Sequence, residues 1–119
     1  MSKPRNRTQL TLPWPPSVNH YYMRLSNGRV IISPEGRAFR DEAVLRANQA
    51  VDYTFHMAVG MQVDLYRPSK HGDIDNNLKG CLDSLIGIAY DDDKQITELH
   101  VYRYDDKANP RVEVTIWQK

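Results

Sequence analysis

The sequence predicts an α+β fold in which two main helices pack on a mixed β-sheet within a single compact domain. Its 119 residues suit one domain, and 40% of them are hydrophobic against 26% charged, as in ordinary globular proteins. Apolar residues alternate at the period of a strand in several segments and recur at helical spacing in two others. The expected order is β-β-β-α-β-α-β-β, an α+β layout. The polar residues 1–6 should be loosely held.

The first three strands are expected before residue 33. Residues 7–12 alternate in the strand manner, and a proline-rich segment then ends the strand. Residues 21–24 and 29–32 flank Asn27-Gly28, which predicts a hairpin because both turn residues accept positive φ.

A long helix follows the hairpin. Ser33 offers a capping hydroxyl, Pro34 suits the first helical position, and Glu35 places a carboxylate at the positive end of the helix dipole. We expect this helix to run to about Val51, with one apolar face.

The C-terminal half predicts a strand, a second helix and two more strands. Residues 57–65 alternate as a half-buried strand, and residues 67–72 form a basic loop. A helix is expected from Asp75 to about Gly87, with leucines on one face. The last two expected strands are residues 96–104 and 111–117.

Composition indicates a soluble cytoplasmic protein without a membrane span. Cys81 is the only cysteine, so no internal disulfide can form, and no apolar stretch is long enough to cross a bilayer. Residues 1–50 hold eight Lys and Arg against three Asp and Glu, whereas residues 51–119 hold eight against twelve. A basic half could follow phosphates while an acidic half holds a cation, although surface charge can also segregate by chance.

The acidic residues around the second helix are the strongest functional signal. Asp73 and Asp75 precede it, and Asp91, Asp92 and Asp93 follow it. In an extended segment the first two carboxylates would lie about 7 Å apart on one side. A helix of about fourteen residues would span about 21 Å, so the two groups meet only if the helix is shorter or the chain doubles back.

Clustered carboxylates favour a hard cation such as Mg²⁺, which can activate water for phosphodiester hydrolysis. Lys79 lies one turn beyond Asp75 and could hold the phosphate or stabilise the leaving oxygen. Simpler interpretations also fit: Asp73 or Asp75 as a helix N-cap, Lys79 as a partner of Asp75 or Asp83, and the later aspartates as a solvated turn. A calcium loop is excluded because glycine and glutamate are missing at the required positions.

Four segments resemble the RusA family of Holliday junction resolvases, found in bacteria and their prophages. The match covers most of the chain, with the motifs in the right order and spacing. They are LPWPPSVNHYY at 12–22, SPEGRAFR at 33–40, DIDN at 73–76 and DDKQI at 92–96.

The resemblance implies that Asp73, Asp75 and Asp93 bind Mg²⁺, for which Mn²⁺ could substitute, and that Lys79 is the catalytic lysine. Asp92 is an alternative ligand, since the run of three aspartates leaves the position uncertain by one. The family works as a homodimer that nicks symmetrically opposed strands of a four-way DNA junction.

The basic loop is expected to contact DNA through Arg67, Lys70 and His71, together with Lys79. This loop is less basic than the arginine-rich stretch associated with the family, which puts junction affinity in question. Two other functions stay open: a generic Mg²⁺ nuclease acting on other branched or duplex DNA, and a catalytically silent DNA-binding protein. The cluster around Trp14 could wedge into a junction, but such aromatic-proline clusters more often fasten a strand to the core.

Overall fold

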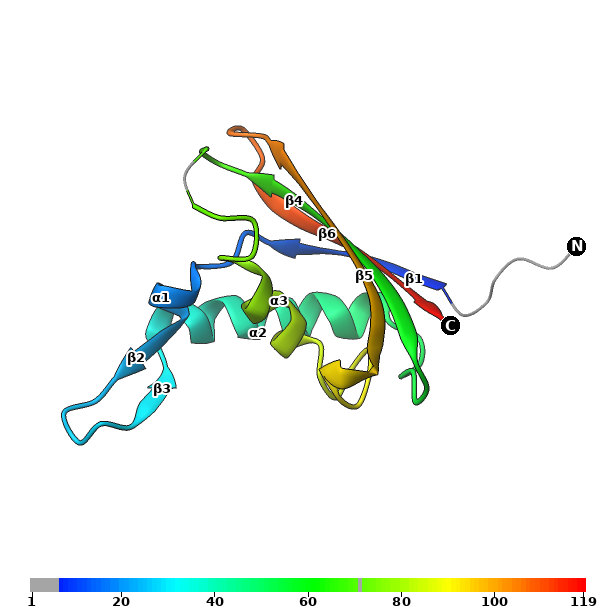
Figure 1. The fold of residues 1–119 in the computed structure, drawn as a ribbon, viewed down its shortest axis with the longest axis horizontal. Helices are drawn as coiled ribbons and strands as arrows, with labels where there is room; N and C mark the ends of the chain where they lie inside the picture. Colours follow the sequence, from blue (N-terminus) through cyan, green and yellow to red (C-terminus); the bar gives the residue numbers. More distant parts are fainter. Residues whose placement is uncertain (1–6, 71) are drawn as a thin grey trace, which may run out of the picture.

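The computed structural model describes residues 7–70 and 72–119 (Figure 1), so the expectation for residues 1–6 lies outside the described residues. The strands are β1 (Arg7–Pro13), β2 (Tyr22–Arg24), β3 (Val30–Ile32), β4 (Val59–Arg67), β5 (Ile96–Asp105) and β6 (Arg111–Gln118). The helices are α1 (Val18–Tyr21), α2 (Pro34–Ala50) and α3 (Leu78–Ser84), with a 3₁₀ turn η1 (Asp93–Gln95). In the described part of the chain, no helix is long and apolar enough to cross a membrane.

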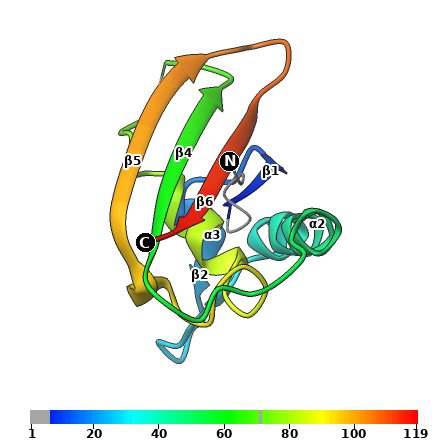
Figure 2. The same cartoon turned by 90° about the vertical axis from the view of Figure 1, so that its right-hand side faces the viewer.

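The main sheet has four strands in the order β1-β6-β4-β5. Strand β6 pairs antiparallel with both β1 and β4, whereas β4 and β5 run parallel. Helices α2 and α3 lie on the same side of this twisted sheet (Figures 1 and 2). The predicted α+β fold with a mixed sheet is therefore confirmed.

The hydrophobic core lies between this sheet and the two helices. Alternate residues of β4 and β6 point into it, as strand periodicity requires. The buried strand residues are Val59, Met61, Val63, Leu65, Val112, Val114 and Ile116. Phe39, Ala43 and Ala47 cover them from α2, as the apolar spacing predicts. Strand β4 begins two residues later than predicted, because Met57 precedes the sheet and is exposed.

The predicted hairpin is present as β2 and β3, which project from the body of the protein (Figure 1). Leu25 N donates to Arg29 O at 2.8 Å and closes a three-residue loop. Gly28 has a φ of 87°, but Asn27 does not have positive φ, so the expected two-residue turn was wrong. Sequence analysis also missed α1, a four-residue helix that contains Tyr21.

The predicted start of α2 is confirmed. Ser33 Oγ accepts a hydrogen bond from Gly36 N at 2.9 Å, and Pro34 occupies the first turn. The helix ends at Ala50, one residue before the expected end.

Helix α3 has seven residues rather than the predicted span from Asp75 to about Gly87. Before it, the chain makes turns in which Asn76 N donates to Asp73 O at 3.1 Å and Leu78 N to Asp75 O at 3.2 Å. After it, Gly87 N donates to Tyr90 O at 2.6 Å, which turns the chain back. A seven-residue helix is only about 10 Å long. The shorter helix therefore removes the distance problem between the two acidic segments.

Candidate active site

The turn that carries Asp73 and Asp75 is fastened to the proline-rich segment after β1. Val18 N donates to Asn76 O at 2.8 Å, and Asn77 Nδ2 donates to Pro15 O at 3.1 Å. These contacts support the structural interpretation of the proline-rich segment. The chain turns at residues 74–77, so the extended segment on which the 7 Å separation of the two carboxylates depended is not present. The N-cap interpretation was also wrong, because Asn77 occupies that position.

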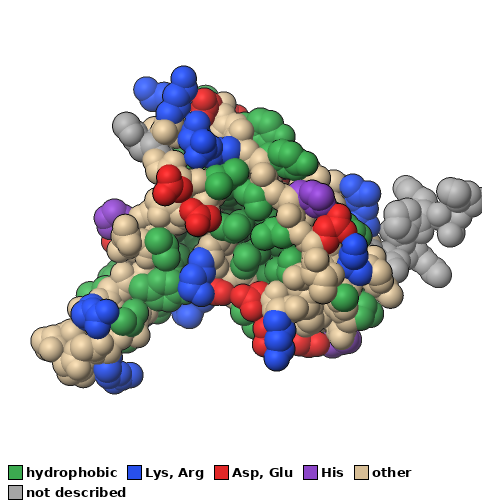
Figure 3. Space-filling model, viewed as in Figure 1, with side chains coloured by type: hydrophobic (Ala, Val, Ile, Leu, Met, Phe, Trp, Pro, Cys, Tyr) green, Lys and Arg blue, Asp and Glu red, His purple; other side chains and the backbone are tan. Residues whose placement is uncertain are grey.

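A hollow of about 370 Å³ lies beside α3, and residues from both acidic segments line it. Asp75 from the turn, Lys79 from α3 and Asp93 from η1 all line it. Its other lining residues are Val18, Asn76, Leu78, Leu82 and Asp83. Asp73 is not among them. Figure 3 shows acidic and basic side chains around hydrophobic ones on this side of the molecule.

The run of three aspartates divides into three different environments. Asp91 pairs with His56, Oδ2 to Nδ1 at 2.8 Å. Asp92 Oδ1 accepts from Lys94 N at 3.0 Å and caps η1. Of the three aspartates, Asp93 lines the hollow. The geometry therefore favours Asp93 over Asp92 as the partner of Asp75.

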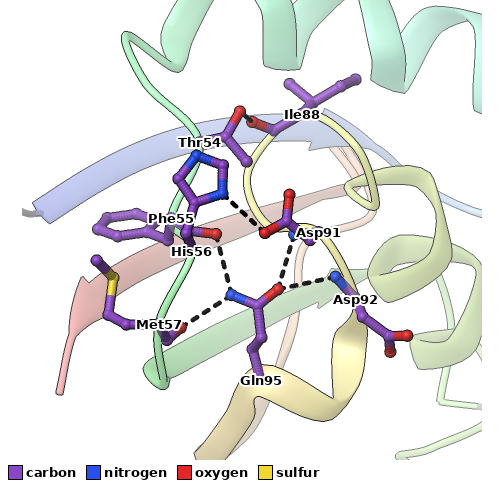
Figure 4. A network of polar contacts seen from close by, with 8 residues as sticks. All are labelled: Thr54, Phe55, His56, Met57, Ile88, Asp91, Asp92 and Gln95. Atoms are coloured by element: carbon purple, nitrogen blue, oxygen red, sulfur yellow. Dashed lines mark hydrogen bonds and ion pairs between the residues drawn. The ribbon is translucent and has the colours of Figure 1, made fainter.

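Gln95 holds this run in place (Figure 4). Its Oε1 accepts from Asp91 N at 2.8 Å and from Asp92 N at 2.9 Å. Its Nε2 donates to Phe55 O at 3.0 Å and to Met57 O at 2.9 Å. One amide side chain thus ties the loop to the segment that precedes β4, and a glutamate could not donate both of the latter bonds.

The charges around the hollow are unbalanced. The pKa of Asp93 is raised by partial burial, by its hydrogen bond with Asp92 and by repulsion from Asp83, while Lys79 opposes the shift. The pKa of Asp92 is lowered, chiefly by the backbone hydrogen bond from Lys94. Asp93 therefore lies where additional positive charge would be favourable.

The carboxylates in the hollow fit a hard divalent cation. Asp75 and Asp93 offer carboxylate oxygens, the ligands that Mg²⁺ prefers, and repulsion on Asp93 would be relieved by a cation. As the side chains stand, no three of the described His, Cys, Asp and Glu residues form a ready metal-binding group. A bound ion would therefore require these carboxylates to close in.

The basic loop contributes less free charge than its sequence indicates. Arg67 Nε contacts Asp105 Oδ1 at 2.6 Å, and only 14% of its side chain is exposed. Lys70 is exposed, and His71 lies outside the described residues. Arg103 on β5 reaches the same loop, where its Nη1 donates to Gly72 O at 3.2 Å.

Sequence analysis did not assign functional roles to two residues near the site. Asp83 was considered only as an ion-pair partner of Lys79, and Arg103 was taken as part of a strand. The i, i+4 spacing on a short helix was an available signal for Asp83. No local signal could place Arg103 beside Gly72, because that contact depends on the parallel pairing of β4 and β5.

Carboxylates and a lysine around one hollow are typical of enzymes that act on phosphodiesters. Comparison with known proteins agrees: residues 13–117 match the family Endodeoxyribonuclease RusA. The chain belongs to this family, and the resemblance seen in its motifs is confirmed.

Relatives of similar length come from bacteria and a phage. The chain is 35% identical over 114 residues to the crossover junction endodeoxyribonuclease RusA of Escherichia coli strain K12, covering 93% of this chain and 94% of the relative. Identity and coverage are the same for the enzyme of that name from Enterobacteria phage 82. The Escherichia coli O139:H28 relative is 33% identical with equal coverage.

Proposed function

We propose that this protein is a Mg²⁺-dependent endonuclease that resolves four-way DNA junctions by paired nicks, during recombination and repair in the bacterial cytoplasm. The proposal rests on family membership along nearly the whole chain and on one geometric observation. Asp75 and Asp93, on opposite sides of α3 in sequence, line the same hollow as Lys79.

The metal would be held by Asp75 and Asp93, with Asp73 contributing from the adjoining turn. When bound, Mg²⁺ supplies polarisation of a phosphoryl oxygen and a water of lowered pKa. Mn²⁺, which accepts similar oxygen ligands, should substitute.

Lys79 is the cation of the chain that lies in the hollow with these carboxylates. Its ammonium can donate to a non-bridging oxygen of the scissile phosphate, and can stabilise negative charge as the bond to the leaving oxygen breaks. The exposed Lys70 and Arg103 lie near the loop before Asp73, and both can contact flanking phosphates. Arg67 is held by Asp105 and would mainly position this loop.

Two nicks in opposed strands require two active sites, and we infer that a homodimer provides them. Sedimentation at working concentration tests this directly: a dimer is expected, and a monomer that still makes paired nicks would contradict it.

Cleavage of a synthetic four-way junction beside linear duplex of the same sequence tests the function. We expect junction cutting in Mg²⁺ and none with chelator. Equal cutting of both DNAs would instead indicate a generic nuclease, and junction binding without cutting would indicate a silent binding protein.

A further inference from the structure

Asp83 makes two contacts through the same carboxylate oxygen. Its Oδ2 lies 3.2 Å from Lys79 Nζ, and it accepts a hydrogen bond from Tyr22 Oη at 2.9 Å. Lys79 is one turn earlier on α3, whereas Tyr22 comes from the start of the projecting hairpin, 61 residues away. The Asp83 side chain is 26% exposed and that of Lys79 is 58% exposed. A half-buried carboxylate therefore contacts an exposed ammonium.

Tyr22 is itself held where it can reach Asp83. Its ring lies against that of Tyr21, with centroids 4.9 Å apart. Tyr21 is buried beneath α3 at Gly80, where an added Cβ would meet the Tyr21 ring at 2.6 Å. The missing side chain thus lets α3 approach the two tyrosines closely. The pKa of Tyr22 is raised to about 12 by burial and by its hydrogen bond to Asp83, so the hydroxyl remains a donor.

We propose that Asp83 is a positioning residue that holds the ammonium of Lys79 at the hollow, and that Tyr22 fixes Asp83 for this task. The proposal rests on the proposed nuclease function and extends it. It also gives a role to the paired tyrosines of the motif at 12–22, which the metal chemistry leaves unexplained.

The physical reason is the flexibility of lysine. A free lysine side chain samples many rotamers, and a catalytic group displaced by even 1 Å can lose much of its effect. The ammonium has three donors, so one can remain on Asp83 while another reaches a phosphate oxygen. Because Tyr22 already holds Asp83, this carboxylate can restrain Lys79, and the ammonium does not need to pair with Asp75 or Asp93.

Asp83→Asn and Tyr22→Phe test this in single-turnover cleavage with enzyme and Mg²⁺ saturating. We expect Asp83→Asn to lower the cleavage rate about 10- to 100-fold and Tyr22→Phe by less, with junction affinity and half-saturating Mg²⁺ nearly unchanged. Glu42→Gln is the control, because Glu42 and Arg46 also form an i, i+4 ion pair, on α2 and outside the hollow. If a rate loss in Asp83→Asn were recovered by raising Mg²⁺, Asp83 would be a metal ligand and the proposal would be overturned.

A double-mutant cycle decides whether Asp83 acts through Lys79. Lys79→Ala alone should reduce cleavage more than binding, and adding Asp83→Asn should then cause no further loss. Independent losses that multiply would overturn the proposal.

A readout without cleavage separates this inference from the nuclease function. The ¹⁵Nζ resonance of Lys79 can be assigned by its absence in Lys79→Ala. We expect its ammonium protons to exchange slowly with water in the wild type, and this protection to be lost in Asp83→Asn. An unchanged resonance would overturn the positioning role even in an active nuclease. If Asp83→Asn alters the resonance but the wild-type protein cuts no DNA, the positioning role would stand and the proposed nuclease function would be wrong.

Discussion

The outer face of the sheet and the hollow beside α3 differ in how their charges are balanced. On the face away from the helices, Arg111 contacts Asp106 and Glu113 at 2.9 Å each, and its guanidinium lies 3.9 Å from the centre of the Tyr66 ring. Tyr66 in turn stacks on Tyr104. Arg111 donates hydrogen bonds to the carboxylates of Glu113 and Asp106, which raise the pKa of Arg111, and the bond to Asp106 lowers the pKa of that carboxyl. Arg111, Asp106 and Glu113 thus each have a partner of opposite charge.

In the hollow beside α3 the balance differs. Three carboxylates, those of Asp75, Asp83 and Asp93, line it with one ammonium, that of Lys79. The pKa of Asp93 is raised, first by burial and then by its hydrogen bond with Asp92 and repulsion from Asp83, and Lys79 offsets only part of this. In a structural ion-pair network such as the one around Arg111, the charges balance one another. In a functional site such as the one proposed here, the carboxylates exceed the cations, and a bound cation would restore the balance.

The largest effect should come from Asp75→Asn, which keeps the side-chain shape and removes one charge from the hollow. We expect junction cleavage to fall by about 10²–10³-fold or more, the scale of losing a charge-stabilising group in an active site. Junction binding should be equal or tighter, because one negative charge near phosphate is lost. Cleavage and gel-shift assays on one junction would measure both, and normal turnover would refute the assignment of Asp75.

Two glycines allow the region of the hollow to be compared with the outer face of the sheet, because a side chain at either position would clash with an aromatic ring. Gly80→Ala would bring Cβ within 2.6 Å of the Tyr21 ring, and Gly60→Ala would bring it within 2.4 Å of Trp117 on the outer face. We expect each to destabilise the protein by about 1–3 kcal/mol in urea unfolding, as overpacking does. Only Gly80→Ala should also slow cleavage at temperatures where both variants are folded. Equal slowing by both would mean that α3 docking has no special effect on the site.

The smallest effect should come from Arg111→Met, which removes the outer-face cation but retains an apolar side chain over Tyr66. We expect a modest decrease in Tm, smaller than that of Gly80→Ala, because ion pairs that are still partly open to solvent contribute little. Cleavage rate and junction affinity should stay at wild-type levels. A large loss of junction binding would show that this face contacts DNA.

Elements with strong local signals were predictable from the sequence. Ser33 and Pro34 marked the start of α2, and regular alternation marked β4 and β6. The limits of α3 were not predictable, because Asn76 and Asn77 bond to Val18 and Pro15, far away in sequence. Tertiary contacts there prevail over helix propensity.

The candidate site was predicted in composition but not in arrangement. The resemblance to the RusA family implied that Asp75, Lys79 and Asp93 share one site, whereas the separate environments of Asp91 and Asp92 depend on Gln95 and its bonds to the distant segment that precedes β4. The role of Asp83 depends on a hydroxyl donated from the hairpin, which no local pattern records.

The central claim is that Asp75 and Asp93 share one divalent cation. Mn²⁺ binding to the DNA-free protein, followed by electron paramagnetic resonance, tests it in the wild type and in Asp75→Asn, Asp93→Asn and Asp92→Asn. We expect each of the first two variants to weaken the same site by about tenfold or more, and Asp92→Asn, which retains the capping oxygen, to have much less effect. Wild-type binding by Asp93→Asn, or an equal loss in Asp92→Asn, would contradict the account.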